Sequence, residues 1–282
     1  MPDFDQLQTL PIPGLADYHC HCDYSADAEG SIDEYCQAAI IRGLAELCFT
    51  THYCEEWSID YSDNYIRTDG EVKRASPDLL ARYVDDVRAA NEKYYPRGLS
   101  VKLGVELGYF KGCEESYAKL HERYGFDYLL CGIHSVEGKS FFVKDDMLKL
   151  YESSPGRMVE HYMEAVISAA NSRLFDTIAH LMYYLRIVPR ILGDEIRTAH
   201  ESLLPEVFKA LIATDTAIEI NTSGIRHGVG HYFPPVEVVN AAKKAGVAVT
   251  YLGSDAHKPE QVGFEFEAAS SLVPSSITVC ED

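Results

Sequence analysis

Basic residues are scarce in this chain. Its 282 residues include 25 Lys and Arg against 44 Asp and Glu, which gives a formal net charge of −19. Nucleic acids and anionic membranes carry charge of the same sign and would be repelled. The imbalance therefore argues against both as partners and favours a small phosphorylated substrate that bound cations attract. We expect a monomer or a small homo-oligomer.

Long apolar runs are also absent. No stretch approaches the roughly 18 apolar residues that a transmembrane helix needs. The first residues, Met1 to Leu10, lack the basic region followed by an apolar one that marks an export signal. We therefore expect a cytoplasmic protein.

The eight cysteines are scattered along the chain, and we predict that they are reduced. Cys20 and Cys22 alternate with His19 and His21, which raises the question of a mixed zinc site. In an extended segment, however, alternate side chains point to opposite sides. The two cysteines are therefore predicted to be small buried hydrophobic residues.

Short apolar runs alternate with longer amphipathic stretches. This alternation is typical of βα units around a parallel sheet or barrel, and one such barrel can fill a chain of this length. The seven predicted strands are Leu15–Tyr18, Leu44–Thr50, Val101–Val105, Tyr128–Ile133, Asp176–Ala179, Ala217–Asn221 and Val247–Gly253. We expect one α/β domain over residues 1–282.

Capping residues predict where several helices begin and end. Ser31 precedes Glu34 by three residues, the spacing of a capping box, and Gly43 would stop that helix. Ser76-Pro77 opens another helix, which ends before Pro96. Further helices are expected at Glu114–Tyr124, Arg157–Arg173, Asp194–Thr214 and Pro235–Ala245, the last closed by Gly246.

The segment from Tyr53 to Ala75 interrupts this rhythm. It is rich in acidic and aromatic residues, shows no periodicity and is too long for an ordinary connection. Because it follows a predicted strand, it would lie over the carboxyl face of a barrel, where active sites of such folds are found. We predict a lid; a surface excursion without a role is the alternative.

Histidines and carboxylates gather at the carboxyl ends of the predicted strands. They are His19, His21, His52, Glu106, His134, His180, Asp255 and His257. Six of the 11 histidines thus fall at one predicted rim. A single buried histidine is more often a core residue than a ligand, but that explanation does not account for the coincidence at so many strand ends.

This set of residues predicts a metal site. Side chains two apart in a strand point the same way, so His19 and His21 can present both imidazoles to one ion. Nitrogen and oxygen ligands with few thiolates suit zinc, manganese or iron. The candidates outnumber what one ion needs. We expect two or three divalent ions with a bridging carboxylate and an activated water.

Taken in order, these residues resemble the motifs of the polymerase and histidinol phosphatase (PHP) family. The matching stretches are Asp17-Tyr18-His19-Cys20-His21, Thr51-His52, Gly104-Val105-Glu106, Gly132-Ile133-His134, Ile178-Ala179-His180 and Gly253-Ser254-Asp255-Ala256-His257. They span nearly the whole chain. Within the family, Asn221-Thr222-Ser223-Gly224-Ile225-Arg226 and Phe175-Asp176-Thr177-Ile178-Ala179-His180 look most similar to the monofunctional histidinol-phosphate phosphatases.

The resemblance implies a distorted seven-stranded TIM-like barrel with a trinuclear metal site. It also implies hydrolysis of L-histidinol phosphate to L-histidinol and phosphate, in histidine biosynthesis. The implied ligands are His19, His21, Glu106 and Asp255 for the first metal, Glu106, His134 and His180 for the second, and His52, His257 and Asp27 for the third. Asp23 and Glu29 are alternatives to Asp27.

Arg226 ends the sixth predicted strand, where a planar guanidinium can bind two phosphate oxygens. We predict that it contacts substrate and takes part in catalysis. Arg186, His227 and Ser254 are further candidates for substrate contacts, with surface charge as the alternative for Arg186 and His227. The family often has an Asp shortly after the fifth motif, whereas here His180 is followed by Leu181-Met182-Tyr183-Tyr184.

The predicted reaction is in-line attack on phosphorus by a metal-bridging hydroxide, with Asp255 or His257 carrying a proton. Trp57 or the acids near it are a hypothesis for recognition of the amino end of histidinol. A PHP-type enzyme for another small phosphomonoester or a nucleotide stays open, as do a metal-dependent amidohydrolase and a catalytically silent metal-binding protein. Amidohydrolases generally use a bridging Lys where this chain has Glu106, and the full ligand set argues against a silent protein.

Overall fold

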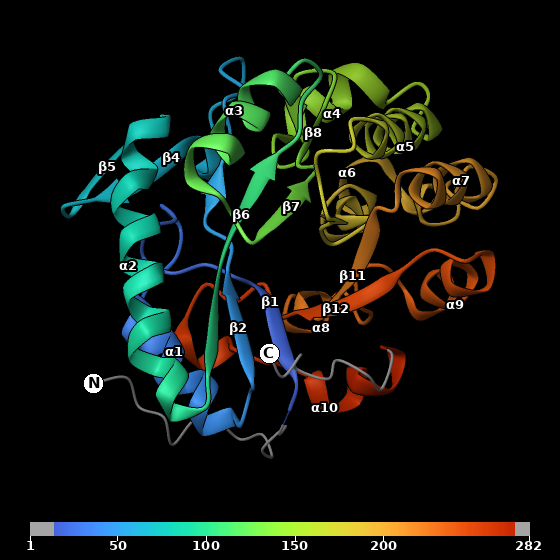
Figure 1. Cartoon of the computed structure of the whole chain (residues 1–282). Coiled ribbons are helices and arrows are strands. Elements are labelled where there is room, and N and C mark those ends of the chain that lie inside the picture. The colour runs from blue at the N-terminus through green and yellow to red at the C-terminus, as the bar shows by residue number, and fades with distance from the viewer. Residues whose placement is uncertain (1–13, 274–282) are drawn as a thin grey trace.

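Parallel strands form a closed barrel at the centre of the computed structural model, which describes residues 14–273 (Figure 1). The strands are β1 (Ala16–Cys20), β2 (Glu46–Phe49) with its continuation β3 (His52–Tyr53), β6 (Ser100–Gly108), β7 (Tyr128–Gly132), β10 (Thr177–Ile178), β11 (Ala217–Asn221) and β12 (Val249–Gly253). Their order is β2-β1-β12-β11-β10-β7-β6, and β2 pairs with β6 to close the circle. The seven-stranded α/β barrel is confirmed, and each predicted run overlaps a strand.

The helices lie around the outside of the barrel, with α1 and α2 on one side and α5, α7 and α9 on the other (Figure 1). Their bounds are α1 (Ile32–Arg42), α2 (Leu80–Tyr94), α3 (Glu114–Tyr124), α4 (Lys144–Tyr151), α5 (Gly156–Asn171), α6 (Pro189–Leu192), α7 (Leu204–Thr214), α8 (Ser223–Arg226), α9 (Val236–Ala245) and α10 (Phe266–Ala269). The predicted capping box is present at Ser31 and Glu34, and Gly43 closes α1 with a φ of 78°. The left-handed conformation at that stop favours glycine.

The structure corrects one predicted helix and adds helices that were not predicted. A single helix from Asp194 to Thr214 is wrong, because residues 194–197 form a short 3-10 turn and α7 begins only at Leu204. Pro205 stands in the first turn of α7, where its missing N–H breaks no helical hydrogen bond; in the middle of a longer helix it would remove one, so the helix starts here. Helix α4 was not predicted at all.

The segment 53–75 is folded. After β3 it forms a 3-10 turn, η2 (Ser62–Asn64), and then an antiparallel hairpin of β4 (Tyr65–Thr68) and β5 (Glu71–Arg74), which lies beside α2 (Figure 1). Asp69 and Gly70 make its two-residue turn with φ of 53° and 78°. Such Asp-Gly turns match the twist of paired strands. Whether the segment moves as a lid stays a prediction.

The described cysteines are all free and buried. Cys20 and Cys22 are fully buried in the large hydrophobic core and belong to none of the described groups that could hold a metal, as predicted. The eighth cysteine, Cys280, and the stretch from Met1 to Leu10 lie outside the described residues. Within residues 14–273 no helix is long and apolar enough to cross a membrane.

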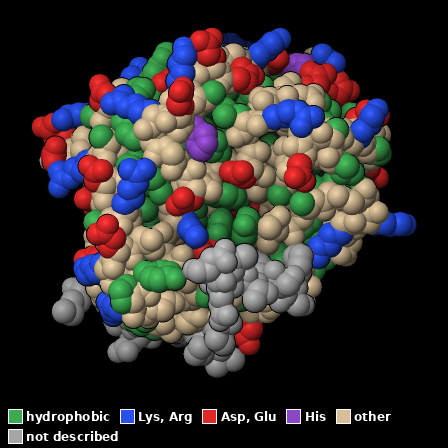
Figure 2. Space-filling model, in the orientation of Figure 1, with side chains coloured by type: hydrophobic (Ala, Val, Ile, Leu, Met, Phe, Trp, Pro, Cys, Tyr) green, Lys and Arg blue, Asp and Glu red, His purple; other side chains and the backbone are tan. Residues whose placement is uncertain are grey.

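Acidic and basic side chains are interspersed over the face of the molecule in Figure 2, and basic groups form no continuous stripe on the described part of that face. Nucleic-acid-binding surfaces usually gather their Lys and Arg into a patch or groove. This face therefore gives no support to a nucleic-acid partner.

Candidate metal centre

Three pairs of histidines meet at the carboxyl ends of the barrel strands. The two Nε2 atoms are 3.0 Å apart in His19 and His21, 3.2 Å apart in His134 and His180, and 3.4 Å apart in His52 and His257. Two nitrogen ligands of one tetrahedral zinc ion are about 3.3 Å apart, given Zn–N bonds of about 2.05 Å. Each pair is therefore spaced as two ligands of one ion would be.

Glu106, on β6, lies between these pairs and is almost fully buried. Its Oε2 is 3.3 Å from His19 Nε2 and 2.9 Å from His52 Nδ1, while its Oε1 is 3.0 Å from His180 Nε2. The two carboxylate oxygens thus face different histidine pairs. This is the arrangement that a bridging carboxylate requires.

Gly132 leaves the space in which Glu106 sits. A Cβ atom at this position would lie 2.5 Å from Glu106 Oε1 and 2.7 Å from His134 Cε1. Gly253 leaves space for the side chain of His19, because a Cβ there would lie 2.7 Å from the Cβ of His19. Both glycines end barrel strands, so the backbone itself shapes the floor of the site.

Asp255 and His257 follow β12. The Asp255 carboxylate is 3.6 Å from His19 Nε2 and 3.4 Å from His21 Nε2. Asp255 has a φ of 52° and His180 a φ of 27°, values that non-glycine residues seldom adopt. Such strain concentrates at functional sites, where surrounding structure holds it in place.

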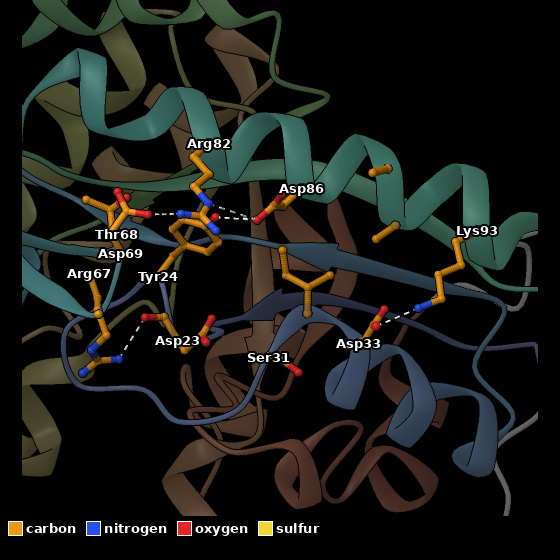
Figure 3. A pocket seen from close by; sticks show the side chains of 14 residues that line it. Asp23, Tyr24, Ser31, Asp33, Arg67, Thr68, Asp69, Arg82, Asp86 and Lys93 are labelled. Atoms are coloured by element: carbon orange, nitrogen blue, oxygen red, sulfur yellow. Dashed lines mark hydrogen bonds and ion pairs between the residues drawn. The ribbon is translucent and has the colours of Figure 1, made fainter.

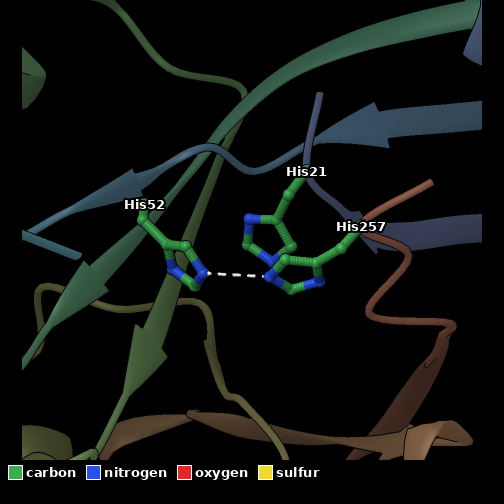
Figure 4. Close-up of side chains that lie close together, drawn as sticks. All are labelled: His21, His52 and His257. Atoms are coloured by element: carbon green, nitrogen blue, oxygen red, sulfur yellow. Dashed lines mark hydrogen bonds between the residues drawn. The ribbon is translucent and has the colours of Figure 1, made fainter. Parts of the chain in front are cut away.

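His21, His52 and His257 converge from β1, β3 and the end of β12 (Figure 4). The rings of His21 and His52 stack with centroids 4.0 Å apart. The exposed carboxylate of Asp27 reaches this group, 3.9 Å from His52 Nε2 and 3.7 Å from His257 Nε2. Of the alternatives to Asp27, Glu29 pairs with Lys258 at 3.0 Å, and Asp23 lines a separate groove.

Opposite charges perturb the acid–base behaviour of this cluster. Burial alone would lower the pKa of His19, but Glu219, Glu106 and Asp255 outweigh it and raise that pKa well above its usual value. Burial would raise the pKa of Glu106, yet His19 and His52 hold it well below its usual range. The carboxylate is therefore ionised and ready to accept a cation.

Glu219 supports the site from behind and was missed by sequence reasoning. On β11, its Oε1 lies 2.9 Å from His19 Nδ1, accepts a hydrogen bond of 2.7 Å from the backbone N–H of His180, and accepts another from Asn221 Nδ2. A carboxylate behind a ligating histidine fixes the ring and its tautomer. An acidic residue inside the run Ala217–Asn221 was the available signal.

Asp63 was also missed. It belongs to the segment 53–75 and is fully enclosed by the site, with Oδ2 2.6 Å from His134 Nδ1 and Oδ1 3.8 Å from His52 Nδ1. Its backbone lies in η2, far from any predicted strand end. Several acids of the segment were equally good candidates by sequence, so only the folded structure selects Asp63.

A cavity of about 460 Å³ opens above the histidine pairs. Its wall includes three of the predicted substrate residues, Arg186, Arg226 and His227, and their contact with substrate stays a prediction. Arg226 donates from Nη1 to the Ser254 carbonyl at 2.8 Å and from Nη2 to the Asp255 carbonyl at 2.6 Å. These bonds fix the guanidinium and leave other N–H groups for a ligand. Burial lowers the pKa of His227 to about 4, so this ring is neutral near pH 7.

The structure places two residues that were expected to contact substrate away from the cavity wall. Ser254 is fully buried and does not line the cavity, and its N–H donates to Asp17 Oδ1 at 3.0 Å. Trp57 is half exposed, packs against Arg74 and is also absent from the cavity wall. Tyr183, in the loop after His180, lies against the His180 ring with the two ring centroids 4.3 Å apart, and it lines the cavity.

The donor set fits divalent metal ions. Four groups of three side chains have ligand atoms within 4.8 Å of one another: His19, His21 and Asp255; His19, Glu106 and His180; His21, His52 and His257; and Asp27, His52 and Asp63. All are imidazoles and carboxylates, which suit zinc, manganese or iron. No lysine lines the described cavity, so no bridging lysine is available there.

The chain is similar to known proteins over most of its length. The PHP domain profile matches residues 17–223. A protein named probable histidinol-phosphatase from Deinococcus radiodurans is 31% identical over 270 residues, 92% of each chain. The histidinol-phosphatase of Lactococcus lactis subsp. lactis is 24% identical over 91% of this chain and 89% of its own.

A solved structure has the same fold. The crystal structure of histidinol phosphate phosphatase from Lactococcus lactis subsp. lactis, complexed with zinc, L-histidinol and phosphate, superposes with a TM-score of 0.75. The two sequences are 20% identical in that superposition, which covers 93% of each chain.

Proposed function

This chain belongs to the PHP domain family, and we propose that it is a metal-dependent phosphomonoesterase that hydrolyses L-histidinol phosphate to L-histidinol and phosphate. The observation that carries the proposal is the set of three histidine pairs, with Glu106 between them, beneath a cavity that presents Arg186 and Arg226. The relatives named histidinol-phosphatase, matched over nearly their whole length, support this substrate. Histidine biosynthesis is the corresponding pathway.

Three ions would fit the described ligands. His19, His21, Glu106 and Asp255 would hold the first; Glu106, His134 and His180 the second; and His52, His257 and Asp27 the third. Bound divalent ions would supply a hydroxide nucleophile near neutral pH and offset negative charge on the phosphoryl oxygens. The identity of the ions is left open among zinc, manganese and iron.

Arg226 and Arg186 are the residues that would orient the phosphoryl group. Arg226 is held by two backbone carbonyls, so little side-chain entropy is lost when its remaining N–H groups bind phosphate oxygens. Arg186 lies against the rings of Tyr183 and Phe142, which restrict it on the same wall. The pair counters the negative charge that builds on the equatorial oxygens during transfer.

Asp255 and His257 are the two groups that can carry a proton at the edge of the site. The His257 side chain is 27% exposed, and its Nδ1 lies 3.0 Å from the Asp255 carbonyl oxygen. The Asp255 carboxylate has a pKa well below its usual range, because His19 and His21 outweigh the effect of burial. This keeps the carboxylate ionised but makes it a weak base, so the imidazole of His257 is the better candidate to return a proton to the leaving alkoxide.

Other small phosphomonoesters and nucleotides are the alternative substrates for the same site. A panel of such esters tests the proposal against them, with kcat/KM measured on protein reloaded with zinc or manganese. We expect L-histidinol phosphate to be preferred by at least about tenfold, on the order of 1.4 kcal/mol of transition-state binding. Tenfold better turnover of a different ester would replace histidinol phosphate as the substrate.

An amidohydrolase or a silent metal-binding protein would release no phosphate from any ester in that panel. Glu106 occupies the bridging position that amidohydrolases generally give to lysine.

The sequence composition further leads us to propose a cytoplasmic monomer or small homo-oligomer without a nucleic-acid or membrane partner. Size-exclusion chromatography with light scattering measures the oligomeric state.

A further inference from the structure

The loop after β1 carries Asp27 to the edge of the metal centre. Its carboxylate is exposed and lies between His52 and His257, while the neighbouring Ser25 is fully buried. Ser25 Oγ accepts a hydrogen bond of 3.1 Å from the backbone N–H of His52 and is 3.4 Å from His21 Nδ1. The position of this loop therefore determines whether Asp27 can complete a ligand set with the two histidines.

Arg67, on β4, holds this loop by its backbone. Its Nη1 lies 2.8 Å from the carbonyl oxygen of Asp23 (Figure 3), 3.2 Å from that of Ser25 and 2.9 Å from that of Ala28, and its Nη2 donates to the Ala26 carbonyl at 2.6 Å. The backbone N–H of Arg67 donates to the Tyr24 carbonyl at 2.8 Å. One residue thus binds every carbonyl of the stretch 23–28 except that of Asp27 itself.

These contacts define a geometry that few side chains can reproduce. Nη1 has two hydrogens for three acceptors, so the carbonyls must point toward a common centre, and the loop curls around the guanidinium. Only arginine offers five N–H donors in a rigid fork, whereas lysine offers three on a compact ammonium. In the groove of Figure 3 the other described cations, Arg82 and Lys93, pair with carboxylates of Asp69 and Asp33 instead.

The segment 53–75, which contains Arg67, also contacts the metal centre through a second residue. Asp63, four residues before Arg67, lies 2.6 Å from His134 and 3.8 Å from His52 through its carboxylate. The segment 53–75 therefore contacts both the ligands on the strands and the loop that carries Asp27. A surface excursion without a role would make neither contact.

We propose that Arg67 is a positioning residue for the third metal ion: it fixes the 23–28 loop so that Asp27 joins His52 and His257. The inference rests on the proposed function, because it assumes that these three side chains bind an ion. It assigns the segment 53–75 a part in building the metal centre. Arg67 contacts neither the ion nor the substrate and acts through Asp27.

A metal titration tests this inference without substrate. Chelator-stripped wild type, Arg67→Ala, Arg67→Lys and Arg74→Ala are titrated with zinc in competition with a chromophoric chelator, and the folded state of each is checked by circular dichroism. Arg74→Ala is the matched control, since it removes an exposed cation of the same hairpin that packs on Trp57. We expect Arg67→Ala to weaken zinc binding at the site that depends on Asp27 by about 10- to 100-fold, the usual effect of losing a group that orients a ligand. Arg67→Lys should be intermediate, and Arg74→Ala should match wild type.

A double-mutant comparison shows whether Arg67 acts through Asp27. In an Asp27→Asn background the Arg67→Ala change should weaken zinc binding little further. Full additivity of the two changes, an unchanged titration of Arg67→Ala, or a wild-type protein with no site that depends on Asp27 would each overturn the inference. If Arg67→Ala does not fold, the zinc titration of Arg67→Lys tests the inference instead, and binding weaker than in wild type is expected. Failure to hydrolyse histidinol phosphate would refute the proposed function but leave the titration result intact.

Discussion

Glu219 lies directly behind His19: both side chains are fully buried, and Oε1 is 2.9 Å from Nδ1 of the ring. The Nε2 atom on the other side of the ring therefore faces His21 and Glu106. We expect Glu219→Gln to lower zinc affinity by about 10- to 100-fold, because the neutral amide orients the imidazole less firmly. Competitive metal titration measures the change. Glu122→Gln, at an exposed position on α3, is the control and should leave affinity unaltered.

Gly132→Ala is expected to damage the metal centre. The added methyl group would lie 2.5 Å from Glu106 Oε1, so the Glu106 carboxylate or β7 must shift. Overpacking of this kind costs roughly 1–3 kcal/mol of stability. Chemical denaturation and metal content are the measurements. Gly156→Ala is the control, since a methyl group added there would meet no heavy atom within 4 Å, and unchanged metal content in both variants would contradict the prediction.

Arg226→Ala should raise KM more than it changes metal content. A hydrogen-bonded charged group contributes about 1.5–3 kcal/mol, which corresponds to roughly 10- to 100-fold in binding. Steady-state kinetics and metal analysis of the same sample separate the two effects. Arg197→Ala removes an exposed cation that pairs with Asp194 and should behave as wild type. Parallel loss of metal from Arg226→Ala would assign that residue to the metal centre instead.

Removal of metal should abolish activity reversibly. A chelator is expected to eliminate phosphate release, and added zinc or manganese should restore it. Because imidazole and carboxylate ligands bind metal only when deprotonated, loading should release protons, and affinity should fall as pH falls. A pH indicator in weakly buffered solution follows the release. Full activity of protein shown to be metal-free would refute the assignment as a metal-dependent phosphomonoesterase.

Trp57→Ala should leave substrate specificity intact. The indole packs on Arg74 at 4.9 Å from the guanidinium carbon and does not border the cavity. We expect kcat/KM for L-histidinol phosphate to stay within about twofold of wild type, as surface substitutions usually change free energies by less than about 0.5 kcal/mol. A larger fall would mean that the segment 53–75 closes over bound substrate and brings Trp57 inward.

The positions of the strands and of most candidate ligands were predictable because both depend on local pattern. Apolar runs bounded by turn residues marked each strand; His134 and His180 follow such runs directly, and His52 follows one after a single residue. Pro205 and the pair Asp69-Gly70 were local signals as well. Pro205 was not used because the helical pattern predicted for Asp194–Thr214 continues through it. Asp69-Gly70 was not used because the segment 53–75 shows no periodicity that would mark the two strands beside the turn.

The supporting residues could not be predicted in the same way. Glu219 faces inward next to a register irregularity between Ile218 and Ile220, where β11 pairs with β12. The acidic residue within the run was a signal, but the irregularity beside it depends on the neighbouring strand and cannot be derived from the run alone. Arg67 and Asp63 reach the site only because the hairpin folds back over the barrel, which is a tertiary relationship between distant parts of the chain.

The first and last strands of the barrel are direct neighbours, with Asp17 opposite Leu252. His19 and His21 precede Asp255 and His257 by more than two hundred residues, so only the closure of the barrel brings these side chains together. An ion bound among them would act as a clasp between two strands that are far apart in the sequence. A fragment that stops before β12 would lack this clasp and would expose the edge of β1.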